Sequence, residues 1–232
     1  MKKIIILSAI VALFASCTVE TKKEFKGYRF QKEYAASDSV KNSSLTKDLT
    51  IDMYVMLHEY PNYSWTNIFT KMKSDRECEF CFRVRDSKAG QFYFGNGSLA
   101  LVLSFNTKEL FKLNNWHRVT LVRDMKKREL RIYADGDLKG KQQFRRGIKA
   151  SALTNSPIYV AGINKRRGDM TIADVKIWNK AMTDSEILKG WGEIKNPESE
   201  KSLVAYWSFE DLVERQIENL AGSELTLTIK KK

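Results

Sequence analysis

The sequence predicts an all-β domain, a sandwich or a barrel made of many short strands. Three observations lead to this class. Short runs in which apolar and polar residues alternate recur along the chain, with turn residues between them. Aromatic residues, which favour strands, make up 11% of the 232 residues, and only three prolines are present to interrupt a sheet. Because 43% of the residues are hydrophobic, the chain can bury a sizeable core, and its length suits one sandwich.

Six runs are expected to form strands, because their side chains would alternate between the two sides of a sheet. They span residues 49–55, 79–84, 92–94, 99–105, 119–122 and 130–135. The pair Asp135-Gly136 follows the last run. An Asp-Gly pair readily adopts the positive φ angles of a tight hairpin, so we expect the chain to turn back there.

One short helix is expected near the C-terminal end. Thr183-Asp184-Ser185-Glu186 has the spacing of a capping box, in which the first and last side chains satisfy each other's backbone amides. Ile187, Leu188 and Trp191 would supply its apolar stripe, and Gly190 and Gly192 would end it.

The first residues have the features of an export signal. Lysines at positions 2 and 3 precede an apolar stretch at 4–14, which is too short to cross a bilayer as a helix. The following Phe-Ala-Ser-Cys resembles the bacterial lipobox, after which Cys17 would be lipidated. We therefore expect a signal peptide at 1–16, a lipidated tether at 17–26 and one domain at 27–229, held by lipid at the bacterial outer membrane or cell surface. An ordinary secretory signal is the alternative, and it too would export the chain.

Several segments resemble those of one family. W-H-R-V-T-L-V-R-D at 116–124 and L-R-I-Y-A-D-G at 130–136 resemble the W-H-x-V … L-x-x-Y-x-D-G hairpin of laminin-G-like domains, members of the concanavalin A-like lectin/glucanase superfamily. I-A-D-V-K-I-W-N-K-A-M-T-D-S-E-I at 172–187 resembles the closing strand and helix of that family. L-V-A-Y-W-S-F-E at 203–210 and I-E-N-L-A-G at 217–222 resemble a further family strand, in an order similar to that of Bacteroidota surface lipoproteins.

The resemblance extends over the whole expected domain, residues 27–229. It implies two antiparallel sheets in a jelly-roll sandwich, with Trp116 and Trp207 buried in the scaffold. These motifs consist largely of scaffold residues, so they specify the fold more than the ligand.

The sequence lacks the residues expected of an enzyme of this superfamily. The glucanases carry acidic residues at alternating strand positions, an arrangement that places an acid and a nucleophile on one face. Here Glu77 and Glu79 alternate, but Cys81 takes the next position, so we interpret both glutamates as a solvated strand end. No G-x-S-x-G motif is present, and His117 lies inside the scaffold motif. We expect no catalysis.

A loop rich in aromatic residues is the candidate ligand-binding surface. Tyr60, Tyr63 and Trp65 lie between expected strands, and Tyr93 would face outward on an adjoining sheet. Aromatic faces stack on the C–H faces of sugars, so a poly- or oligosaccharide is the expected partner. The alternative is that some of these rings fold back and cap the edge of the sandwich.

Basic loops suggest that the saccharide could be anionic. The formal net charge is +12, and Lys and Arg cluster at 126–128, 145–146 and 165–167. We expect Arg166 and Arg167 to border the site, because arginine forks onto carboxylate or sulfate groups. A solvated surface, or one facing anionic lipid, would explain the same charge. No nucleic-acid recognition motif is visible.

Neither a metal nor another cofactor is expected. Cys78-Glu79-Phe80-Cys81 lacks the further ligands of a zinc site, so the cysteines are interpreted as buried or loosely paired thiols. Calcium binds many relatives, and Asp135, Asp137 and Asn164 could supply oxygens, but no loop spells out a site. The sequence therefore favours a non-catalytic, carbohydrate-binding surface lipoprotein of a glycan-capture system. The competing class is a structural or protein-interaction module of a cell-surface complex.

Overall fold

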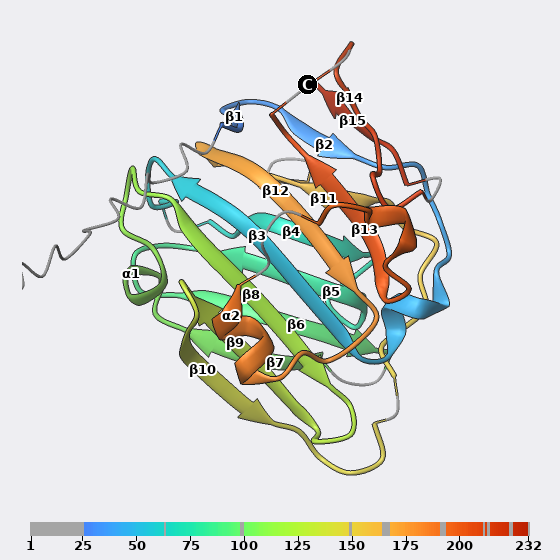
Figure 1. The fold of residues 1–232 in the computed structure, drawn as a ribbon. Coiled ribbons are helices and arrows are strands. Elements are labelled where there is room, and N and C mark those ends of the chain that lie inside the picture. Colours follow the sequence, from blue (N-terminus) through green and yellow to red (C-terminus); the bar gives the residue numbers. More distant parts are fainter. Residues whose placement is uncertain are drawn as a thin grey trace, which may run out of the picture.

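The computed structural model describes residues 26–62, 64–97, 100–148, 150–163, 168–190, 194–210, 212, 214–222 and 225–231. The described part of the chain forms fifteen strands and a few single helical turns, arranged as two antiparallel sheets (Figure 1). The expected all-β, two-sheet antiparallel sandwich is confirmed. No helix within the described residues is both long and apolar enough to cross a bilayer. The expected signal peptide, and Cys17 with it, lies outside the described residues.

The strands follow one another with short connections. Their bounds are β1 Tyr28–Phe30, β2 Tyr34–Ala36, β3 Leu49–Leu57, β4 Thr66–Met72, β5 Glu77–Val84, β6 Gly90–Asn96, β7 Ala100–Phe105, β8 His117–Asp124, β9 Glu129–Ala134, β10 Asp137–Gln143, β11 Ile158–Val160, β12 Met170–Trp178, β13 Leu203–Ser208, β14 Gln216–Ile217 and β15 Leu227–Lys230. The helices are α1 Thr107–Leu110 and α2 Asp184–Lys189, with 3-10 turns η1 Ser43–Thr46 and η2 Pro197–Ser199.

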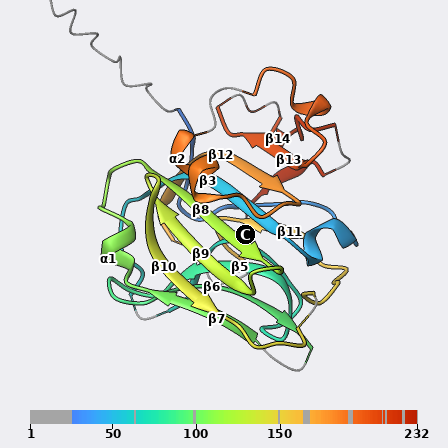
Figure 2. The ribbon, with the colours of Figure 1, turned by 60° about the horizontal axis from the view of Figure 1, so that its bottom comes forward.

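The strands are divided between two sheets, and the chain passes from one sheet to the other through its connections. The seven-stranded sheet has the order β1-β12-β3-β8-β9-β10, and β13 pairs with the C-terminal part of β12, beyond the residues that pair with β1. The eight-stranded sheet has the order β14-β15-β2-β11-β4-β5-β6-β7. The β3–β4 loop passes from the first sheet to the second, and the chain returns through α1 into β8. Figure 2 shows the two layers from a second direction.

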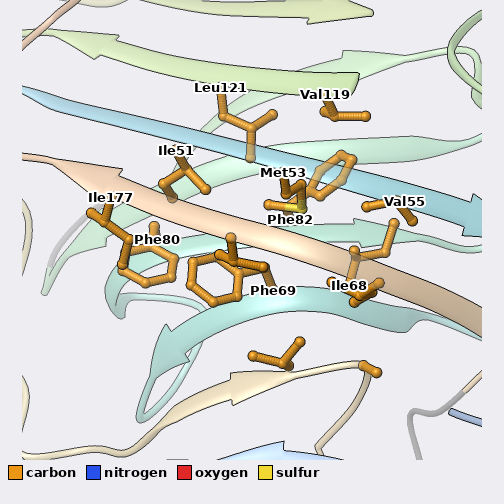
Figure 3. Close-up of a cluster of buried hydrophobic side chains, with 14 of the residues drawn as sticks. Ile51, Met53, Val55, Ile68, Phe69, Phe80, Phe82, Val119, Leu121 and Ile177 are labelled. Carbon is orange, nitrogen blue, oxygen red and sulfur yellow. The ribbon is translucent and has the colours of Figure 1, made fainter. Parts of the chain in front are cut away.

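The core fills the space between the sheets with inward-facing apolar side chains. Ile51, Met53 and Val55 of β3 alternate toward the interior and meet Phe69, Phe80 and Phe82 of the opposite sheet (Figure 3). Phe69 and Phe80 stack with ring centroids 5.0 Å apart. This burial removes a large apolar surface from water and stabilises the packing of one sheet on the other.

A second, smaller cluster lies on the outer side of the seven-stranded sheet. There Ile187 of α2 and Met182, which lies just before it, pack with Val122, Tyr133 and Trp178. Figure 1 shows α2 in front of β8 and β9. Both faces of β8 are therefore partly apolar, as its sequence predicts.

The predicted turn and helix are present at their expected positions. Asp135 and Gly136 have φ angles of 56° and 90°, the left-handed values that a tight hairpin requires. Both hydrogen bonds of the capping box form between Thr183 and Glu186, and Gly190 ends the helix with φ of 71°. The single turn α1 was not anticipated. It begins at Asn106, whose side chain accepts a hydrogen bond from the Lys108 amide.

The two scaffold tryptophans differ in burial. Trp207 is fully buried, and its indole nitrogen donates to the Leu225 carbonyl over 2.7 Å. Trp116 is only half-buried, so the expectation that both are core residues is right for one of them. Trp116 lies just before β8, and its ring approaches the backbone at Gly27.

The interpretation of Glu79 as a solvated residue is wrong. Its side chain is fully buried and lies 3.0 Å from the Nζ atom of Lys71, which is buried as well. Arg123 enters the same interior region and donates to the Lys47 carbonyl over 2.6 Å and to the Glu79 carbonyl over 2.5 Å. Buried charged groups thus lie together at the end of the sandwich near Leu49, with Lys71 paired to Glu79 and Arg123 bonded to backbone carbonyls. Glu77 lies at the surface and pairs with Lys73, as expected for an exposed strand end.

Candidate functional site

The β3–β4 loop crosses the end of the sandwich opposite the buried charges. Tyr60 is half-buried on it, and its hydroxyl donates to the Phe111 carbonyl over 2.9 Å. Lys108 of α1 lies 6.0 Å from the centre of the Tyr60 ring. Tyr60 therefore caps the sandwich, which is the alternative that the sequence left open for these rings.

Trp65 lies at the far end of the same loop, where the chain enters β4. It is half-buried. The guanidinium carbon of Arg83 lies 4.3 Å from the centre of the Trp65 ring, and that of Arg85 lies 5.4 Å from it. Arg83 lies on β5, and Arg85 comes directly after the last residue of that strand. Because the two residues are two positions apart, both project from the outer face of the eight-stranded sheet. Cation–π contacts of this kind hold the indole against the sheet.

Tyr93 joins this cluster from β6, because it too projects from the outer face of the sheet. The guanidinium carbon of Arg83 lies 4.6 Å from the Tyr93 ring centre. The structure thus brings together two of the predicted residues, Trp65 and Tyr93, through an arginine that sequence reasoning missed. The alternation of side chains along β5 places Arg83 on the same side of the sheet as Cys81. This alternation is the sequence signal that could have identified Arg83 as part of the site.

Tyr93 is not the exposed residue that the sequence predicted. It projects outward, away from Phe92 and Phe94, but only 1% of its surface is accessible. Met72, Cys78, Cys81 and Val102 surround it, and its hydroxyl donates to Asp75 over 2.9 Å. Burial raises the pKa of this hydroxyl well above its usual range. Tyr93 supports Arg83 from beneath and has no surface to offer a ligand.

Hydrogen bonds fix Arg83 in this position. Its Nε and NH2 groups both donate to the Gln91 side-chain oxygen, over 3.0 and 2.8 Å. Its NH1 group lies 3.4 Å from a carboxylate oxygen of Asp75. With its planar group held from two sides, Arg83 provides a rigid base for Trp65. The amide of Asn67, opposite Arg83 on β4, is buried without a hydrogen-bond partner among the described residues.

The remaining predicted residues lie outside the described part of the chain. These are Tyr63, Arg166 and Arg167. The flanks of the segment that holds the two arginines are described, however. Gly168 lies against Thr66, the residue that follows Trp65, since a methyl group added to Gly168 would sit 3.0 Å from the Thr66 methyl.

Both histidines have structural partners. His117 lies 2.8 Å from Asp135 through Nδ1, and its Nε2 accepts the Lys112 amide over 2.9 Å. Because Nε2 accepts from an amide, the Nδ1–H of His117 must be the donor to Asp135. His58 contacts Asn114 and Thr171 through its two ring nitrogens, at 2.9 and 2.7 Å. Neither ring is positioned as a general base.

The oxygens considered for calcium are also engaged where the structure describes them. Asp135 accepts from His117 and from the Arg118 amide, and these bonds outweigh burial and lower its pKa. Asp137 lies 3.4 Å from Lys139. No group of three or more His, Cys, Asp or Glu side chains that could hold a metal occurs within the described residues. Asn164 lies outside them.

The comparison with protein families assigns the fold. A laminin-G family model, described as the concanavalin A-like lectin/glucanases superfamily, matches residues 31–188, more than half of the chain. The protein belongs to this superfamily. No curated protein matches its sequence.

Solved structures with the same fold match this chain at low sequence identity. One is a candidate carbohydrate-binding protein of Bacteroides ovatus, with a TM-score of 0.60 and 13% identity over 87% of this chain. This chain spans 60% of the length of that protein. A heptameric SAP-like pentraxin of Limulus polyphemus has a TM-score of 0.53 and 12% identity, covering 89% of this chain and 93% of its own. The binding domain of botulinum neurotoxin DC, solved with SialylT, has a TM-score of 0.55 and 14% identity, covering 69% of this chain and 41% of its own.

Proposed function

We propose that the chain is a non-catalytic carbohydrate-binding protein whose ligand contacts Trp65. The arrangement of Trp65 on Arg83 carries this proposal. A half-buried indole is held at the outer face of a sheet by an arginine that is itself fixed by Gln91 and Tyr93. Such a pre-positioned ring can stack on the C–H face of a sugar without the entropy cost of ordering a mobile side chain. The family and its carbohydrate-binding relatives support the same class of ligand.

The described residues support binding without cleavage. Both ring nitrogens of each histidine contact structural partners, and the buried carboxylate of Glu79 is paired with Lys71. The carboxylates that contact the two arginines beside Trp65 are already engaged: Asp75 accepts from Tyr93 and Arg83, and Asp86 accepts from Arg85. Glycoside hydrolysis requires two carboxyl groups facing one sugar.

Glycan-array binding of the mature chain, residues 17–232, tests the site. We expect Trp65→Ala to abolish binding to whichever glycan the native protein retains. Tyr206→Ala is the matched control, because Tyr206 is a half-buried ring on the outer face of the other sheet. If Trp65→Ala binds as the native protein does, the site lies elsewhere. If no glycan is retained at all, the protein-interaction alternative takes its place.

Salt dependence separates a neutral from an anionic glycan. Stacking on Trp65 depends little on ionic strength, whereas exposed charge contacts are screened within about 8 Å at physiological salt. Arg85 has an exposed guanidinium next to Trp65, and Arg166 and Arg167 are proposed to border the same surface. For an anionic glycan, Arg85→Gln and the pair Arg166→Ala with Arg167→Ala should each weaken binding, and added salt should reproduce the loss.

We propose further that Cys17 carries a lipid that anchors the protein at the bacterial outer membrane or cell surface, as part of a glycan-capture system. The short apolar stretch that ends at Ala15-Ser16-Cys17 supports this. Cys17→Ala should release the protein from the membrane fraction of the cells that make it. A variant that is cleaved normally and stays in the membrane would refute lipidation at Cys17.

A further inference from the structure

A hollow at one end of the sandwich, where the first strand and the last strand of the fold come close, has a strongly basic lining. It has a volume of about 480 Å³ and is lined by Arg29, Gln31, Lys32, Glu33 and Lys231. These residues belong to the end of β1, the turn that follows it, and the residue after β15. Figure 1 shows β1 and the C-terminal end on the same side of the molecule.

The acidic groups at this hollow are already matched by cations. Asp169 accepts from Nε and NH2 of Arg29 over 2.9 and 2.7 Å. Glu33 accepts from the Tyr28 hydroxyl and, over 2.9 Å, from Arg215. The Arg29 bonds lower the pKa of Asp169, and the Tyr28 and Arg215 bonds lower that of Glu33, so both stay ionised and occupied. Of the five lining side chains, Arg29, Lys32 and Lys231 are basic and only Glu33 is acidic, so the lining carries an excess of positive charge.

Two further lysines lie close to the lining residues in the sequence. Lys26 precedes β1, and Lys230 ends β15 beside Lys231; both are exposed. A concave surface with several cations of one sign is complementary to a phosphate group, which offers several anionic oxygens to lysine and arginine donors.

The position of the hollow along the chain limits where it can lie when the protein is anchored. Lys26 is only nine residues after Cys17. A chain of that length reaches at most about 30 Å when fully extended. If Cys17 is lipidated, the basic hollow is therefore held within a short distance of the headgroups of the membrane. Anionic headgroups attract basic residues that lie close to the surface.

We propose that this hollow, which we call the basic hollow, binds the phosphate groups of anionic membrane lipids and thereby docks the domain on the membrane that carries its tether. This inference rests on the proposed lipid anchoring, and it assigns Lys32 and Lys231 a role separate from the surface at Trp65. Two attachments, one lipid chain and one basic surface, bind a membrane more stably than either alone.

Vesicle co-sedimentation tests the docking without the lipid chain. All described strands lie between Tyr28 and Lys230, so residues 17–232 with Cys17→Ser keep the complete fold. We expect this protein to bind vesicles of phosphatidylcholine with phosphatidylglycerol and not vesicles of phosphatidylcholine alone. Each lysine near a surface of anionic lipid contributes about fivefold in affinity, so Lys32→Gln with Lys231→Gln should weaken binding about 25-fold.

The matched control changes the same charge at the opposite end of the sandwich. Lys126 and Lys127 are exposed in the β8–β9 turn, so Lys126→Gln with Lys127→Gln should leave vesicle binding unchanged. If both double variants lose affinity equally, net charge alone is responsible and the basic hollow is not a site. Absence of binding to the anionic vesicles also overturns the proposal, as does binding that inorganic phosphate abolishes at equal phosphate concentration.

The failure of this inference is distinguishable from the failure of the proposed function. Glycan binding by Lys32→Gln with Lys231→Gln should match that of the native protein, because Trp65 and Arg83 are untouched. Membrane release of the Cys17→Ala variant reports lipidation separately. A protein that is lipidated and binds glycan, but whose unlipidated form ignores anionic vesicles, refutes the docking alone.

Discussion

Cys78 and Cys81 face the same side of β5 because the strand bulges between them. The register toward both neighbouring strands shifts between these residues. The extra residue of the bulge places both thiols on the outer side of the sheet, in one cluster with Met72 and Tyr93. A regular strand would have put positions three apart on opposite sides.

Both thiols should be unreactive in the folded protein. They are free and buried, and burial raises the pKa of each. Because the thiolate is the reactive form, Ellman's reagent should label neither cysteine of the Cys17→Ser chain at neutral pH, and both after unfolding in guanidinium. Rapid labelling of the folded chain would contradict their burial. Absence of labelling after unfolding would mean that they are bonded to each other.

At the scale of single residues, alternation predicted the direction of a side chain but not its surroundings. Tyr93 projects from the outer face as its sequence position implies, yet Arg83 and the bulged cysteines cover it. Glu79 appeared to be a surface residue because its burial depends on a cross-strand pair with Lys71 and on the amide of Thr154, which lies far along the chain. The register and bulges of paired strands decide such cases, and alternation within one strand does not encode them.

At the scale of elements, α2 offers a direct test of a local signal. The Thr183 hydroxyl accepts from the Glu186 amide and donates to the Glu186 carboxylate, which also accepts the Thr183 amide. Thr183→Ala removes the cap and should lower the free energy of unfolding by about 1 kcal/mol. Lys189→Ala, at an exposed position in the last turn of the same helix, is the control and should leave stability nearly unchanged. Equal effects in thermal denaturation would show that the box contributes nothing.

The capping box also has a predicted pH dependence. Hydrogen bonds from Thr183 lower the pKa of Glu186 below its usual value in the folded chain. A carboxyl group whose pKa falls on folding contributes stability above its unfolded pKa and loses that contribution as the pH falls through the folded value. The stability difference between the native chain and Thr183→Ala should therefore shrink on acidification below about pH 4.5.

Local signals predicted the elements well where the chemistry lies within a few residues. The Asp135-Gly136 turn and the Thr183 box follow from the conformations that their residues favour. The turn α1 was missed because four residues leave too short a pattern, and only the cap at Asn106 marks it. The candidate site was predicted only in part, because only some of its features are visible as a local pattern. The aromatic residues were visible in the sequence, whereas the contact of Arg83 with Trp65 depends on the pairing of β4, β5 and β6.

At the scale of the whole molecule, Lys71 connects three distant parts of the chain. Its ammonium group donates to the carbonyls of Val40, Thr154 and Ser156 over 2.7, 3.1 and 2.9 Å, and it pairs with Glu79. The segment before β3 and the segment before β11 are thereby fastened to the eight-stranded sheet. Thr154 completes the network, since its amide donates to Glu79 over 2.8 Å.

Lys71→Met should therefore destabilise the whole fold. The substitution leaves the Glu79 carboxylate buried without its countercharge, which typically costs about 3–5 kcal/mol. For a domain of this size the melting temperature should fall by roughly 10 °C. Lys73→Met is the matched control. Lys73, two positions after Lys71, forms an ion pair with Glu77. Its side chain is 69% exposed, and exposed ion pairs contribute little to stability.

The origin of the Lys71→Met effect can be separated from simple loss of packing. Adding Glu79→Gln to Lys71→Met removes the unpaired charge and should recover part of the lost stability, measured as a coupling free energy in a double-mutant cycle.

Burial already raises the pKa of Glu79 in the native chain, and the loss of Lys71 raises it further. A carboxyl group whose pKa rises on folding binds more protons in the folded state between its two pKa values, so stability falls as the pH rises through that window. The destabilisation by Lys71→Met should thus be smallest in acid and grow as the pH rises above the ordinary glutamate pKa. A destabilisation that is equal at all pH values and unaffected by Glu79→Gln would show that the buried ion pair is not what fastens the two segments to the sheet.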